Sequence, residues 1–137
     1  MDDYEKLVKE LVKLPKETEW IEFKHNNDNP EEIGEYISAL SNAATLHHKE
    51  CAYMVWGIED STRKIVGTSF DNKAKKIGNE ELENWLYKLL SDNANFSFHS
   101  VKIDNLDLIL LIIYKAINRT IRFKNIDYIR VGAIRRN

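Results

Sequence analysis

The chain has 137 residues, of which 43% are hydrophobic and 31% are charged, and its net charge is −2. This composition is ordinary for a folded domain, and it argues against a disordered chain or a protein that coats nucleic acid through its overall charge. A single cysteine excludes a disulfide framework, and the longest apolar run, residues 108–114, is too short to span a bilayer. We therefore expect one cytoplasmic domain over residues 1–137, with no membrane partner.

The first half of the chain predicts a helix, a strand and a second helix. Apolar spacing favours a helix from about residue 3 to 14, which Pro15 ends. A strand is expected at 19–24, where apolar and polar residues alternate. The segment Asn29-Pro30-Glu31-Glu32 is typical of a helix start, because it combines an Asn cap, a proline in the first turn and acidic side chains at the positive end of the helix dipole.

The second half is richer in predicted strands. We expect a strand at 51–58, its hairpin partner at 64–68, a helix at 79–90, a hairpin of 96–103 with 106–114, and short strands near 121–123 and 128–131. Together these elements predict an α/β (α+β) fold. Its mixed β-sheet would have about six strands, packed by two to three helices.

The strand at 19–24 carries a pair of charges that has two interpretations. Alternation places Glu22 and Lys24 on one face, while Ile21 and Phe23 enter a core. In metal-dependent nucleases such a carboxylate holds a divalent cation and the lysine steadies phosphate charge. An ion pair on a half-buried strand explains the same residues, and from these residues alone it is the simpler interpretation.

Cations gather toward the end of the chain. Residues 119–137 contain one acidic residue, Asp127, and six basic residues. The basic residues are Arg119, Arg122, Lys124, Arg130, Arg135 and Arg136. A basic segment on an otherwise acidic domain binds phosphate backbones. A soluble tail left by cutting a longer chain would have the same composition, and the sequence does not choose between these interpretations.

Several common sites are missing from the sequence. It has no Gly-x-x-x-x-Gly-Lys-Ser/Thr loop and no Gly-x-Gly-x-x-Gly, so nucleotide binding is not expected. The adjacent His47 and His48 do not have the spacing of a zinc site, and a Gly-x-Ser-x-Gly elbow is absent. We therefore expect no cofactor.

Five segments, taken in order, resemble the Schlafen-type AlbA-like domain. The opening Glu17-Thr18-Glu19-Trp20-Ile21-Glu22-Phe23-Lys24 resembles its Glu-Ser-x-x-x-Glu-Phe-Lys motif. The others are the Ala-x-x-Asn-type helix at 37–44, the Gly-Val-x-Asp-like turn at 55–60, Ile-x-Gly at 65–67 and Tyr-x-Arg-x-Gly at 128–132. One region differs, because the family's Gly-Gly before the central strand is replaced by the glycine-free segment 45–50.

The resemblance implies an AlbA-like domain at the N-terminus of a longer bacterial protein, of the kind described as transcriptional regulators or helicase-related DNA-binding proteins. We predict a nucleic-acid-binding module that prefers DNA to RNA. Its predicted phosphate contacts are Lys24, Arg119, Arg122, Lys124, Arg130, Arg135 and Arg136.

Two alternatives accompany this prediction. In the animal Schlafen nucleases three acidic residues form the cleavage site. By motif position they are Glu17, Glu22 and Asp60, which would hold Mg²⁺ or Mn²⁺ with Lys24 beside them. The third hypothesis is a homo-oligomerisation module that forms a homodimer through a sheet edge or through the apolar hairpin at 96–114.

Overall fold

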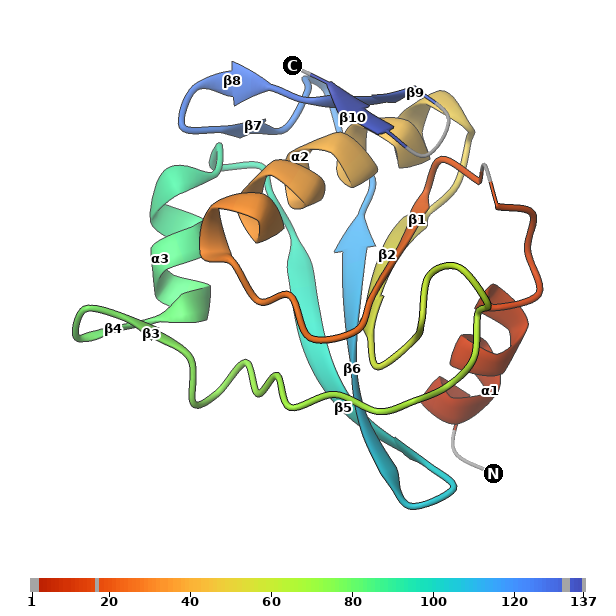
Figure 1. Ribbon diagram of the computed structural model, residues 1–137. Helices are drawn as coiled ribbons and strands as arrows, with labels where there is room; N and C mark the ends of the chain where they lie inside the picture. The colour runs from red at the N-terminus through yellow and green to blue at the C-terminus, as the bar shows by residue number, and fades with distance from the viewer. Residues whose placement is uncertain (1–2, 17, 132–133, 137) are drawn as a thin grey trace.

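In the computed structural model, which describes residues 3–16, 18–131 and 134–136, a four-stranded sheet lies between helices (Figure 1). The helices are α1 (Asp3–Leu11), α2 (Pro30–Leu46) and α3 (Leu82–Leu89). The strands of the main sheet lie in the order β1 (Ile21–Lys24), β2 (Cys51–Trp56), β6 (Leu106–Tyr114) and β5 (Phe96–Ile103). Strands β1 and β2 are parallel, and the other two pairs are antiparallel.

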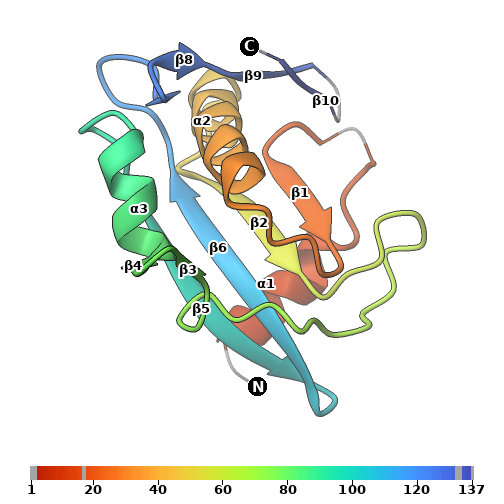
Figure 2. The same ribbon diagram turned by 60° about the vertical axis from the view of Figure 1, so that its left-hand side comes forward.

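Three small antiparallel sheets complete the described fold. They pair β3 (Lys76–Ile77) with β4 (Glu80–Glu81), β7 (Arg122–Phe123) with β8 (Ile126–Asp127), and β9 (Ile129–Val131) with β10 (Ile134–Arg136). The views in Figures 1 and 2 place the last four strands along α2, on the side of that helix away from the main sheet. The basic end of the chain therefore returns over the second helix.

The core has two parts, one on each face of the main sheet. On one face, residues of α2 and α3 such as Ile37 and Leu86 pack with Trp56 of β2. On the other face, Val8 of α1 packs with Phe23 of β1 and with neighbouring strand residues. The central strands thus bury both faces, which explains why β2 and β6 have nearly continuous apolar sequences.

Several sequence predictions are confirmed. The fold is a mixed α/β fold, and the side-chain oxygen of Asn29 accepts a hydrogen bond from the backbone N–H of Glu32 at 3.0 Å, as expected of the helix cap. The hairpin of β5 and β6 turns at Asp104-Asn105, where both residues have positive φ, 51° and 66°. Two such residues form the hairpin turn that matches the twist of the strands.

The predicted strand at 64–68 is wrong. The structure has only an isolated bridge between Ile58 and Ile65 there, because β2 already pairs with β1 on one side and β6 on the other. The main sheet accordingly has four strands instead of six, and the remaining strands form the small sheets. The first helix ends at Leu11, three residues earlier than predicted, and no helix among the described residues is long and apolar enough to cross a membrane.

Candidate nucleic-acid interface and neighbouring cavities

Strand β1 presents its charges as the alternation predicts. Ile21 and Phe23 are buried in the core on the α1 side, while Glu22 and Lys24 share the opposite face. The ammonium of Lys24 lies 3.5 Å from Oε2 of Glu22 and 5.0 Å from the ring centroid of Tyr36 on α2. This lysine is therefore held between a carboxylate and an aromatic ring.

Arg130 of β9 binds the other carboxylate oxygen of Glu22. Its Nη1 donates to Oε1 of Glu22 at 2.9 Å, and its Nη2 donates to the backbone oxygen of Ile21 at 3.1 Å. The Arg130 side chain is 1% exposed and that of Glu22 is 12% exposed. The pair joins the end of the chain to β1, so Arg130 is a buried structural residue and not part of the exposed basic surface.

The acidic residues predicted as metal ligands are only partly described. Glu17 lies outside the described residues, whereas Glu22 and Asp60 line one cavity of about 260 Å³. Both oxygens of Glu22 already contact cations, and no group of three potential metal-ligating side chains occurs in the described part of the chain. Glu22 and Asp60 by themselves therefore do not complete a Mg²⁺ or Mn²⁺ site, and the set of three with Glu17 stays a prediction.

Three of the predicted phosphate contacts lie together on the surface. Arg119, Arg122 and Lys124 line a cavity of about 440 Å³ together with Lys88 at the end of α3, and we call this the basic hollow. The sequence did not point to Lys88, which is 31 residues before the nearest of the other three. The side chains of Arg135 and Arg136, also predicted contacts, are not among those described.

Acidic side chains meet most of these cations at exposed positions. Arg119 pairs with Asp92, and Lys124 pairs with Glu31. The paired side chains are 45–85% exposed, so each pair contributes at most about 1 kcal/mol to folding and is easily exchanged. Arg122 is exposed and makes no ion pair with any described residue.

Two polar residues of α2 position the segment that carries the basic hollow. Asn42 donates to the backbone oxygens of Ile121 and Tyr128 and accepts from the N–H of Ile121. Ser38, one turn earlier, donates to the same oxygen of Ile121 at 2.6 Å and accepts from the N–H of Tyr128. Both side chains are buried, and their spacing of four residues on an otherwise apolar helix face is the sequence signal for this role.

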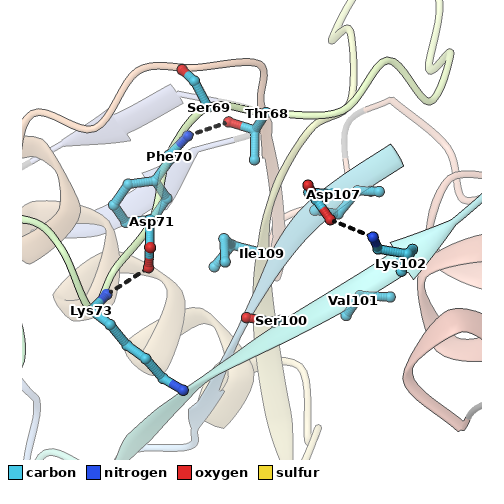
Figure 3. Close-up of a pocket in the computed structure, with 11 residues that line it drawn as sticks. Thr68, Ser69, Phe70, Asp71, Lys73, Ser100, Val101, Lys102, Asp107 and Ile109 are labelled. Atoms are coloured by element: carbon cyan, nitrogen blue, oxygen red, sulfur yellow. Dashed lines mark hydrogen bonds and ion pairs between the residues drawn. The ribbon is translucent and has the colours of Figure 1, made fainter. Parts of the chain in front are cut away.

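A different cavity, of about 590 Å³, lies between the loop at 68–73 and the β5–β6 hairpin (Figure 3). Lys102 pairs with Asp107 at 3.4 Å, and the carboxylate of Asp71 accepts from the backbone N–H of Lys73. Phe70 and Ile109 supply apolar lining. Because acids and bases alternate around it, this cavity has no single charge preference.

Comparisons with known proteins agree with the fold. The DIP2311 protein from Corynebacterium diphtheriae, known from its crystal structure, is similar with a TM-score of 0.60 and 17% identity. The match covers 96% of this chain and 29% of that one, so the chain spans less than a third of the solved relative. No curated protein shows significant similarity. Residues 17–137 match the Schlafen AlbA_2 family, and the chain therefore belongs to this family.

Proposed function

We propose that this domain binds nucleic acid, and DNA in preference to RNA, through the basic hollow, as part of a longer bacterial regulator. The observation that carries the proposal is the convergence of Arg119, Arg122, Lys124 and Lys88 on one cavity. Membership of the AlbA_2 family also suggests a function related to nucleic acid.

Local charge matters here because the net charge of the chain is −2. Phosphate contacts give affinity without reading base sequence, and each one releases counterions. The exposed acids beside Arg119 and Lys124 are weak partners, so a phosphate replaces them at small cost. We therefore expect modest affinity that weakens steeply with salt.

The direct test is fluorescence anisotropy with a short labelled DNA duplex and its RNA equivalent. Charge reversal in the variant Arg119→Glu/Arg122→Glu/Lys124→Glu should abolish measurable binding. The matched control is Lys64→Glu/Lys73→Glu/Lys102→Glu, which changes net charge equally at exposed lysines outside the basic hollow. Equal losses in the two variants would contradict the assigned surface, and tighter binding of RNA would contradict the preference for DNA.

Metal-dependent nuclease activity is the second proposal, and it is supported by the shared cavity of Glu22 and Asp60. Its test is cleavage of labelled RNA and DNA in the presence of Mn²⁺ by the parent protein and by Glu22→Gln. Activity that falls in the variant would support the proposal. Equal cleavage by both proteins would indicate a contaminating enzyme.

A further inference from the structure

The cavity beside Glu22 has a surplus of positive charge that the metal hypothesis does not explain. Lys16, Arg63 and Arg130 line it, against the carboxylates of Glu22 and Asp60. Arg130 and Lys24 already neutralise Glu22. Neither Lys16 nor Arg63 forms an ion pair with a described residue, so the remaining field favours an anion over a divalent cation.

Two guanidinium groups of this cavity keep an unused donor. The Nε–H groups of Arg63 and Arg130 are buried and have no hydrogen-bond acceptor. Arg130 itself is only 5% exposed. Buried donors are nearly always paired in folded proteins, so unpaired donors on two residues that line the same cavity point to an acceptor that would enter beside them.

Both arginines are also fixed in place. Nη1 of Arg63 donates to the backbone oxygens of Val12 and Leu14, and its guanidinium lies 4.5 Å from the ring centroid of Phe23. Arg130 is held by Glu22 as described above. Because these groups are already ordered, binding an oxyanion costs them little conformational entropy, and a planar guanidinium matches oxyanion geometry.

The edge of β1 adds backbone donors. The oxygens of Trp20 and Lys24 accept hydrogen bonds from the β2 side, from Tyr53 and Gly57. The alternation of a parallel strand therefore turns the N–H groups of Ile21 and Phe23 away from β2, toward the free edge where the cavity lies. Backbone N–H groups next to cationic side chains are a recurring arrangement in phosphate sites.

We propose that this cavity, which we call the arginine pocket, binds a phosphate group. Its volume of about 260 Å³ corresponds to roughly nine waters, at about 30 Å³ each, which leaves room for a phosphate group. The phosphate comes either from inorganic phosphate or from the terminus of a nucleic acid. The inference is independent of the basic hollow, because the two cavities have no lining residue in common.

Nuclear magnetic resonance tests the proposal at the residues themselves. Titration with inorganic phosphate should shift the Nε–H signals of Arg63 and Arg130 in a saturable manner, whereas Mn²⁺ in phosphate-free buffer should show no saturable binding there. In a second arm, a short oligonucleotide with a 5′-phosphate is compared with the same strand ending in a 5′-hydroxyl. Stronger shifts with the phosphorylated strand would assign the terminus as the source, and no shifts with either strand would assign free inorganic phosphate. Equal shifts with both strands would indicate internal phosphodiesters and would contradict the proposed sources.

Variants separate this site from the basic hollow. Arg63→Gln should weaken phosphate binding by about tenfold or more, as expected when a charged donor is lost. Because Arg63 also holds the backbone after α1, Lys16→Gln provides a second variant at an exposed side chain, with the exposed Lys13→Gln as its control. The charge-reversal variant of the basic hollow, Arg119→Glu/Arg122→Glu/Lys124→Glu, should leave the affinity for phosphate unchanged. Absence of saturable shifts, or equal affinity in the Lys16 and Lys13 variants, would overturn the proposal.

Discussion

The arginine pocket and the basic hollow use the same kinds of side chain in opposite ways. In the pocket, the side chain of Arg130 is 1% exposed and is fixed by Glu22 and a backbone oxygen. In the hollow, Arg119 is 56% exposed and pairs with an acid that is itself 85% exposed. Burial makes the first group an ordered structural donor, whereas exposure makes the second an exchangeable contact. The comparison shows that arginine count alone does not define a nucleic-acid surface.

The largest expected effect is on stability, at the buried pair. Arg130→Met leaves Glu22 with only the more distant Lys24, so we expect a loss of about 3 kcal/mol in unfolding free energy. Urea denaturation followed by circular dichroism measures it. Adding Glu22→Gln should recover part of the loss, because the unpaired charge is removed. A change below about 0.5 kcal/mol in the single variant would mean that the pair is not formed.

The second largest effect is expected in the salt dependence of binding, which should differ between the basic hollow and the arginine pocket. If three phosphates are neutralised in the basic hollow, DNA affinity falls with a logarithmic slope of about −2.7, or about 40-fold between roughly 50 and 200 mM salt. Binding of inorganic phosphate in the arginine pocket should change far less, since it involves one small anion and partly buried donors. Anisotropy and phosphate titrations at matched salt check this. Parallel losses for both ligands would contradict the distinction.

A substitution at Gly34 of α2 should disturb the basic hollow and leave the arginine pocket intact. A β-carbon at this position would overlap the ring of Phe123 on β7, the strand that carries the basic hollow. We expect Gly34→Ala to destabilise the protein by about 1–2 kcal/mol, because the overlap outweighs the better helix propensity of alanine. DNA affinity should fall while phosphate binding persists. Thermal and urea unfolding measure the first effect, and a stabilised variant would refute it.

The smallest effect is expected at the exposed pair. Arg119→Gln should change unfolding free energy by no more than about 0.5 kcal/mol, because its partner Asp92 remains in water. The same substitution should weaken DNA binding measurably. Denaturation and anisotropy on one protein preparation check both statements. A large loss of stability would show that Arg119 has a structural role, and it would blur the comparison with Arg130.

Local features of the fold were predictable from sequence because they depend on near neighbours. The alternation at 19–24 correctly placed Glu22 and Lys24 on one face of β1, and Asn29 correctly marked the start of α2. The pair Asp104-Asn105 marked the hairpin turn. Strand pairing was less predictable, since 64–68 has a strand-like pattern but finds both edges of β2 occupied.

Tertiary structure alone decided which charges meet. Arg130 lies 108 residues from Glu22 along the chain, and no periodicity links the two. Lys88 joins the C-terminal cations for the same reason: the chain returns over α2, where Ser38 and Asn42 hold it. The sequence by itself determined the mixed fold, the family motifs and the basic end. Only packing separated a buried structural arginine from exposed ones, because burial depends on contacts between segments far apart in sequence.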